Sequence, residues 1–548
     1  MSQEVLRIGR VIEINGTKTI GELEASISDL YRTYKSRKYA IGQVGSIVKI
    51  ETSDVIVFGV ITSLRMVESN EINFGNLSRR MDASSKWIEI ELFGEGHRIG
   101  LNEEDFDFER GISNYPLPGQ YIFLSTVDEL RKIYAKPDKP TMRVGSVSQA
   151  SGLPVHLLIN ELVGKHFAVL GTTGSGKSCA ITLILKSIIG VCPFAHIILL
   201  DPHNEYHRAF PNDANILDPT SLKIPHWLLN FEESTELFIG KTEFAATRQT
   251  NILQDAILKS KKNFTNQVIA ENKITVDTPI PYKLGDLVHF INDDKGDLPP
   301  SRSESHDKIL NKIDTLRRDK RFDFLLVSDS DVSDNLFDLM SNLLRIPIAG
   351  KPMTIIDLSG VPSDVVDVVV SVLCRSIFDF SLWNQRRIEF PLLLVCEESH
   401  RYAPKKEEAA FQPTKRALAR IAKEGRKYGV GLALVSQRPS ELSESILSQC
   451  NTIIAMRMNN EQDQQFVRKA LPDSVRSLVD ALPTLRKRES LIVGEGTAVP
   501  VRMIFDVIPE ELRHQSADVK FSESWSHENV DDNLVKDVIK RWREQERH

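Results

Sequence analysis

The sequence predicts an α/β fold in which a small N-terminal β-barrel precedes a mostly parallel β-sheet that carries an inserted helical subdomain. Three observations support this prediction. Residues 6–126 contain short runs of β-branched and aromatic residues, with strands expected at 55–62 and 86–94. Further along, continuous apolar runs alternate with helical segments, as in parallel sheets that are covered on both faces. Residues 232–344 have helical spacing and mixed charge.

Within the barrel region, the strand pattern competes with a helical pattern only around residues 26–36. The apolar runs that follow have the length and composition of buried strands. The expected sheet strands are 167–171, 195–201, 353–360, 392–398 and 431–437.

Composition sets limits on the class of protein. With 548 residues, two to four domains are expected, and 41% hydrophobic and 26% charged residues are typical of a soluble globular protein. Five scattered cysteines without a CxxC pair favour neither a zinc ribbon nor a disulfide framework. The first residues lack the apolar stretch of a signal peptide and no run has the length of a membrane span, so we expect a cytoplasmic protein without membrane contact.

The strongest motif follows the first apolar run. Residues 171–178 read GTTGSGKS, which fits the pattern GxxxxGK[ST], with a strand before it and a helix after it. Glycines let backbone N–H groups wrap phosphate oxygens, and the helix start adds its positive dipole end. Lys177 is expected to reach the β- and γ-phosphates of ATP, and Ser178 to ligate Mg²⁺. The predicted nucleotide-binding residues are Gly171, Thr172, Thr173, Gly174, Ser175, Gly176, Lys177, Ser178 and Cys179.

Two acids end the run LLLVCEE at 392–398. In P-loop ATPases, one acid at such a strand tip helps to hold Mg²⁺, and a second orients and deprotonates the attacking water. We expect Glu397 in the first role and Glu398 in the second. The alternative is a strand end with solvated acids, which the phosphate-binding loop of the same sheet disfavours.

Three weaker features accompany these motifs. Gln437 ends the last expected strand and could sense the γ-phosphate, or be an ordinary polar residue at a strand end. The basic helix at 416–431 could carry an arginine finger to a neighbouring subunit, or be a solvated basic face. In DPHNEY, His203 could ligate a metal, but without further ligands nearby a polar loop is favoured.

Four of these segments together resemble the HerA class of the HerA–FtsK ATPases. The segments are GKHFAVLGTTGSGKS, DPHNEY, LLLVCEESHRYAP and IAKEGRKYGVGLALVSQRP, and the resemblance spans about residues 140–510. It implies a RecA-like P-loop ATPase core behind a barrel of the HerA-associated type. The implied parts are a barrel at 1–126, a connector at 127–165, a core at 166–231 and 345–508, a helical subdomain at 232–344 and a C-terminal arm at 509–548.

The resemblance also implies a function. Proteins of this class form hexameric rings that use ATP and Mg²⁺ to move double-stranded DNA through a central pore, together with a nuclease or, in bacteria, a sirtuin-like effector in anti-phage defence. It implies that Glu398 is the catalytic acid, Gln437 the sensor, Arg426 the finger acting in trans, and Lys405 a second residue acting in trans. Glu397 departs from the aspartate that is common at the metal-side position.

The net charge of −6 leaves a second hypothesis open. The chain would then be an assembly platform that organises and activates an effector enzyme, docked on the barrel side, with little DNA pumping of its own. If duplex DNA is the cargo, a minority of basic residues must contact it. Candidates are the segments 203–208, 317–321 and 486–488, although the last two could be solvated surface.

Overall fold

A computed structural model of the chain divides into two compact units. Unit 1 comprises residues 1–193, 398–406 and 422–508, and unit 2 comprises residues 194–397, 407–421 and 509–548. The residues that the structure describes are 4–27, 31–67, 85–99, 105–148, 150, 152–218, 221, 224–240, 246–264, 269–361, 363–406, 411–513, 522, 525–526 and 532–544.

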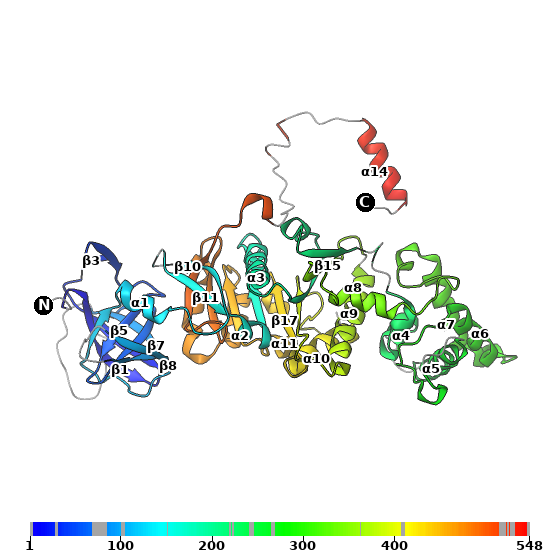
Figure 1. The fold of residues 1–548 in the computed structure, drawn as a ribbon, viewed down its shortest axis with the longest axis horizontal. Coiled ribbons are helices and arrows are strands. Elements are labelled where there is room, and N and C mark those ends of the chain that lie inside the picture. Colours follow the sequence, from blue (N-terminus) through cyan, green and yellow to red (C-terminus); the bar gives the residue numbers. More distant parts are fainter. Residues whose placement is uncertain are drawn as a thin grey trace. The chain divides into compact units, whose positions relative to one another are not determined.

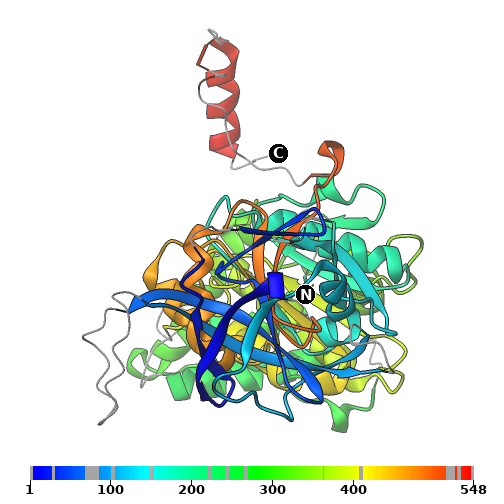
Figure 2. The same ribbon diagram turned by 90° about the vertical axis from the view of Figure 1, so that its left-hand side faces the viewer.

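The N-terminal β-barrel is confirmed. Six strands follow one another in the order β2-β1-β9-β5-β6-β7, and pairing of β2 with β7 closes the ring (Figures 1 and 2, blue strands). Alternate residues point inward and form an apolar core that includes Ile8, Val57 and Ile88. The six strands are β1 (Arg7–Asn15), β2 (Lys18–Leu23), β5 (Ile47–Glu51), β6 (Val55–Val67), β7 (Ser85–Arg98) and β9 (Tyr121–Leu124).

Two details of the barrel differ from the sequence-based expectation. The helical pattern at 26–36 does not form a helix over the described residues 31–36; the hairpin of β3 (Tyr31–Tyr34) and β4 (Arg37–Ala40) begins there instead. Tyr and Thr favour a strand at this place, and the hairpin pairing satisfies their backbone groups. β8 (Phe106–Arg110) extends the sheet beyond β7.

The sheet of unit 1 has a short parallel centre and a longer antiparallel flank. β12 lies between β17 and β18 and is parallel to both. From β18 outward the order is β19, β20, β10, β11, and each of these strands is antiparallel to its neighbour. The strands are β10 (Thr141–Val147), β11 (Pro154–Leu158), β12 (Phe167–Leu170), β17 (Val430–Ser436), β18 (Thr452–Met456), β19 (Glu489–Gly494) and β20 (Val501–Phe505).

This flank corrects the expectation of a plain connector at 127–165. The segment contains α1 (Val127–Ile133), β10, β11 and α2 (Ile159–Gly164), and β10 pairs with β20 from the C-terminal part of the chain. Pairing over such a sequence distance leaves no local signal, which is why residues 141–158 were not expected in the sheet.

Unit 2 holds four parallel strands in the order β16-β13-β15-β14, each buried along its length except at the edge. Helices α4 to α8 follow β14, which confirms helical structure over the described part of 232–344 (Figure 1, green). The strands are β13 (His196–Asp201), β14 (Ala214–Leu217), β15 (Met353–Asp357) and β16 (Leu392–Cys396). The helices are α4 (Phe231–Phe238), α5 (Ala246–Asn263), α6 (Leu284–Lys295), α7 (Pro300–Arg318), α8 (Leu336–Leu344) and α9 (Ser363–Trp383).

Five further α-helices lie among the described residues: α3 (Lys177–Val191), α10 (Gln412–Tyr428), α11 (Glu444–Leu447), α12 (Glu461–Ala470) and α14 (Asp532–Glu544). No helix among the described residues is long and apolar enough to cross a membrane.

Candidate nucleotide-binding site

The phosphate-binding loop lies at the carboxyl end of β12, where the sequence places it. Gly174 and Gly176 have φ angles of 74° and 105°, a region that side chains with a Cβ rarely adopt. Gly176 is also the N-cap of α3 and offers no side-chain cap to the helix. The strand, the turn and the helix start therefore form the anion-binding arrangement that the motif predicts.

Backbone hydrogen bonds from neighbouring strand ends hold the loop. Gly171 N–H donates to the carbonyl of Ser436, the last residue of β17, at 3.2 Å. The N–H and the hydroxyl of Thr172 both donate to the carbonyl of Arg457, each at 3.0 Å. Arg488 N–H donates to the carbonyl of Ser175 at 2.9 Å. The loop is thus fixed by three segments that are remote in sequence, which prepares it for a phosphate without reorganisation.

Lys177 and Gln437 both lie against this loop. Lys177 is 7% exposed, and its Nζ donates to the carbonyl of Thr172 at 3.2 Å. The hydroxyl of Thr173 donates to Oε1 of Gln437 at 2.5 Å. The structure therefore brings the side chain expected to sense the γ-phosphate into direct contact with the phosphate-binding loop.

Glu398 has an unusual backbone conformation. Its φ is 50°, in the left-handed region, and the residue is 6% exposed. The next residue, Ser399, donates from both its N–H and its hydroxyl to the carbonyl of Val435 in β17, at 2.9 and 3.0 Å. A tight turn fastened to β17 thus directs the Glu398 carboxylate, and strained residues of this kind are concentrated at functional sites.

The Glu398 carboxylate lies close to a partly buried histidine. Oε2 of Glu398 lies 3.2 Å from Nδ1 of His400, and the same nitrogen lies 3.3 Å from the hydroxyl oxygen of Ser436. The pKa of His400 is lowered to about 4, mainly by burial; Glu441 opposes this lowering, and Arg438, Arg401 and Lys177 contribute to it. The ring is therefore neutral near pH 7. Sequence reasoning overlooked His400, although it lies two positions after Glu398.

Glu397 belongs to unit 2, where it is paired with a tyrosine. The hydroxyl of Tyr206 donates to Oε2 of Glu397 at 3.1 Å, and Glu397 N–H donates to the carbonyl of Leu200 in β13. Tyr206 comes from the DPHNEY segment. Its hydroxyl holds the carboxylate of Glu397 in a fixed orientation, a role that the sequence alone did not suggest.

Asp201 shapes the DPHNEY segment. Its buried carboxylate accepts the N–H groups of His203 at 3.2 Å and Tyr206 at 3.0 Å. Burial raises the pKa of Asp201, Asp357 raises it further, and the backbone donors lower it. Among the described residues, no group of three or more His, Cys, Asp or Glu side chains is placed to hold a metal ion.

These features agree with a family match over the segment that includes the phosphate-binding loop. Residues 142–377 match the family model described as "Helicase HerA, central domain". The chain is therefore similar to HerA-type ATPases. Its N-terminal barrel and α/β core have the fold class expected from that resemblance.

The similarity to several known proteins extends over most of the length of this chain. The "DNA double-strand break repair helicase HerA" of Pyrococcus furiosus is 28% identical over 494 residues, which cover 80% of this chain and 84% of that protein. The protein of the same name from Sulfolobus acidocaldarius is 27% identical and covers 77% of this chain and 80% of its own. Among solved structures, plasmid coupling protein TrwB with a non-hydrolysable ATP analogue matches 70% of this chain and 94% of its own, at 13% identity and a TM-score of 0.47.

Arg426 lies away from the phosphate-binding loop of its own chain. It is exposed near the end of α10, and its charge acts on His166 and Glu495. His166 directly precedes β12, so this place is at the opposite end of β12 from the loop. Lys405 is exposed and forms an ion pair with Glu444, with 2.9 Å between Nζ and Oε1.

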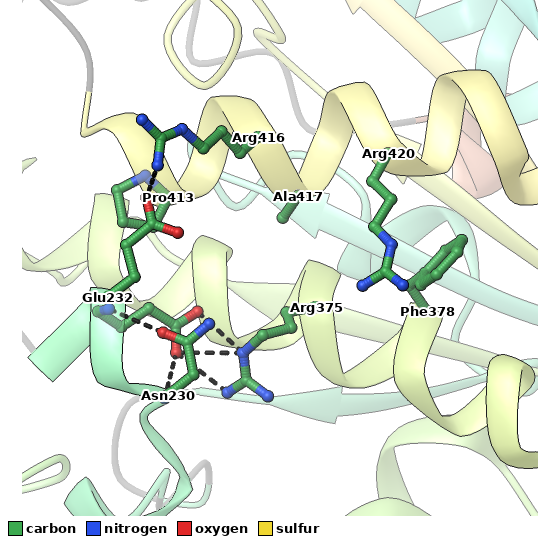
Figure 3. A pocket seen from close by; sticks show the side chains of 9 residues that line it. Asn230, Glu232, Arg375, Phe378, Pro413, Arg416, Ala417 and Arg420 are labelled. Carbon is green, nitrogen blue, oxygen red and sulfur yellow. Dashed lines mark hydrogen bonds and ion pairs between the residues drawn. The ribbon is translucent and has the colours of Figure 1, made fainter. Parts of the chain in front are cut away.

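The remaining arginines of the basic helix line a pocket of about 170 Å³ in unit 2 (Figure 3). Arg416 is paired with Glu232, and the guanidinium of Arg420 lies 4.3 Å from the ring centre of Phe378. Arg375, on the facing helix, is paired with buried Glu233 at 3.0 Å. At the start of α10, Arg416 is therefore paired with an acid and Arg420 packs on an aromatic ring. These contacts are compatible with the alternative in which the basic helix is a surface basic face.

Arg488 is one of the basic residues considered for DNA contact, but it lies against the phosphate-binding loop. Besides its backbone bond to Ser175, its guanidinium donates to the carbonyl of Phe505 at 2.9 Å. A Cβ added at Gly176 would lie 3.3 Å from the Arg488 nitrogen. Arg488 thus packs on the phosphate-binding loop.

Proposed function

We propose that this chain hydrolyses ATP and uses the energy to translocate or unwind double-stranded DNA. The observation that carries the proposal is the grouping, within unit 1, of the phosphate-binding loop, Gln437 and the buried carboxylate of Glu398. In this proposal, Lys177 binds the β- and γ-phosphates, Gln437 senses the γ-phosphate and Glu398 deprotonates the attacking water.

Mg²⁺ is proposed to accompany ATP. The hydroxyl of Ser178, at the start of α3, and the carboxylate of Glu397 are the oxygen donors that the sequence motifs offer, and Mg²⁺ prefers oxygen ligands. The Tyr206 hydroxyl fixes the orientation of the Glu397 carboxylate. The bound ion would neutralise charge on the phosphates. Ser178 and Glu397 are therefore proposed as its protein ligands.

The assembly we propose is a hexameric ring in which Arg426 acts on the ATP of a neighbouring subunit. This role is compatible with its exposed position at the opposite end of β12 from its own phosphate-binding loop. Lys405, also exposed, is proposed to act in trans as well. Relatives named as DNA double-strand break repair helicases support DNA as the cargo.

Mixing two inactive variants tests the trans role of Arg426. Arg426→Ala has an intact phosphate-binding loop, and Lys177→Ala has an intact finger. Rings that contain both should contain some complete sites, so we expect partial recovery of ATPase activity, measured as phosphate release. Mixed rings are verified by two affinity tags. Absence of recovery in verified mixed rings would show that Arg426 does not act in trans.

A salt series tests DNA as the cargo. Contacts to phosphates release counterions, so duplex binding should be independent of sequence and should weaken steeply as salt rises. We expect DNA-stimulated ATPase activity to fade in parallel with duplex retention. If the protein neither binds duplex DNA nor responds to it at low salt, with its effector present, the assembly platform replaces the translocase.

The effector partner, a nuclease or a sirtuin-like enzyme that could act in anti-phage defence, is proposed to dock on the barrel. A closed barrel pairs its own strand edges and leaves loops free for a partner. We expect hydrogen exchange of residues 1–126 to slow when a candidate effector is added, while α3 stays unchanged. Protection confined to residues outside 1–126 would place the partner elsewhere.

A further inference from the structure

The end of β18 holds the side of the phosphate-binding loop that faces away from β17. The carbonyl of Arg457, the residue that follows β18, accepts both the N–H and the hydroxyl of Thr172, each at 3.0 Å. A Cβ added at Gly171 would lie 2.8 Å from the Cβ of Met456 and 3.5 Å from the carbonyl oxygen of Arg457. The loop therefore runs in direct contact with this strand end, on the other side of β12 from the strand that precedes Gln437.

Arg457 has a charge that its surroundings do not compensate. Its Nε is buried, and among the residues that the structure describes its guanidinium forms neither an ion pair nor a hydrogen bond. By contrast, two other partly buried arginines of unit 1, Arg7 and Arg502, are paired with Glu24 at 2.5 Å and with Glu489 at 2.8 Å. An unpaired donor of a charged group is costly where protein excludes water. An acceptor from a bound ligand would remove this cost.

We propose that Arg457 is a further nucleotide-binding residue, whose guanidinium contacts a phosphate of the ATP bound in its own subunit. The inference rests on the proposed ATP site at residues 171–178. A phosphate has several acceptor oxygens, and a planar guanidinium donates to two of them at once. The hydrogen bonds between the Arg457 carbonyl and Thr172 fix the backbone from which the side chain extends. Arg457 thus acts from the β18 side of the loop, and Gln437 from the β17 side.

The test uses the full chain and measures its affinity for a non-hydrolysable ATP analogue by calorimetry. Arg457→Ala keeps the backbone carbonyl that holds Thr172, so the loop should keep its shape. Loss of a hydrogen bond between charged groups should weaken binding about 10- to 100-fold. Arg457→Met keeps most of the length of the side chain and should lose as much affinity. Arg457→Lys keeps the charge without the planar fork, so it should recover part of the affinity.

Two comparisons identify the group that Arg457 contacts. Inorganic triphosphate has phosphates but no base or sugar, so its inhibition constant as a competitor should also rise in Arg457→Ala. An unchanged inhibition constant, together with weaker binding of the ATP analogue, would place the guanidinium on the base or the sugar and overturn the proposal. Retention of duplex DNA at low salt should not change. Lost retention with normal nucleotide affinity would assign Arg457 to DNA instead.

A matched arginine and mixed rings serve as controls. Arg143→Ala removes an exposed arginine of β10 that is paired with Asp506, and it should leave the affinity and the melting temperature unchanged. Rings that contain both Arg457→Ala and Lys177→Ala subunits should have only the summed activity of the two variants, because both residues serve the same site. Recovery beyond this sum would mean that Arg457 acts in trans, against the proposal.

The same measurements separate this inference from the function on which it rests. If the unchanged protein binds and hydrolyses ATP but Arg457→Ala binds the analogue normally, the role of Arg457 fails and the proposed ATPase stands. If the unchanged protein neither binds nor hydrolyses ATP, the proposed function itself fails.

Discussion

Lys177→Ala is expected to reduce ATP hydrolysis to the background rate. The ammonium group is the cation of the phosphate-binding loop, and the surrounding protein shields it from water, since Lys177 is 7% exposed. A preorganised charge in such a site stabilises the charge that develops on the transferred phosphoryl group. Its loss should cost on the order of 10²- to 10³-fold in kcat, as for the removal of one such donor in other enzymes.

The measurement is steady-state phosphate release at saturating ATP and Mg²⁺. Lys186→Ala is the matched control, because it removes the same side chain further along α3. The control should keep its activity, and both variants should melt near the temperature of the unchanged protein. Near-normal turnover by Lys177→Ala would exclude the assignment of residues 171–178 as the phosphate-binding loop.

Glu398→Gln is expected to stop hydrolysis while ATP remains bound. Glutamine keeps the size and polarity of glutamate but cannot take a proton from water, and loss of a general base typically costs about 10²- to 10⁴-fold. The turn around residue 398 should be retained, because the N–H and the hydroxyl of Ser399 hold it by donating to the carbonyl of Val435. Single-turnover experiments with radiolabelled ATP should therefore recover intact ATP from the protein.

Glu397→Gln distinguishes the two neighbouring acids. If Glu397 holds Mg²⁺, its replacement should raise the Mg²⁺ concentration needed for half-maximal activity, and excess Mg²⁺ should restore part of the rate. Glu398→Gln should not respond to Mg²⁺. The opposite pattern, with Glu398→Gln active and Glu397→Gln inactive, would mean that the two roles are reversed.

The parts of the site that could be predicted from the sequence are those that a short segment determines by itself. Residues 167–191 contain the strand, the glycine turn and the helix of the phosphate-binding loop, so the motif and its context can be identified together. The acids at 397 and 398 are likewise defined by the strand that they end. The fold class followed from the same local signals, because buried parallel strands are continuous apolar runs.

The contacts that complete the site connect residues remote in sequence, and no local pattern predicts them. Tyr206 and Glu397 are 191 positions apart, and Thr172 and Arg457 are 285 positions apart. The antiparallel flank from β18 to β11 was not predicted, because β10 pairs with β20, which is remote from it in sequence. Arg488 was considered for DNA contact because of its charge, but its backbone bond to Ser175 could not be foreseen.

Because the backbone of Glu398 is left-handed, stability and catalytic activity favour different residues at position 398. A residue with a Cβ in this conformation costs roughly 1–2 kcal/mol relative to glycine, which adopts it without strain. Glycine at position 398 would therefore make the folded chain more stable and abolish the proposed base. In a selection for thermostability alone, we expect glutamate at position 398 to be replaced by glycine or asparagine. If glutamate is retained under such selection, ATP turnover must be required as well.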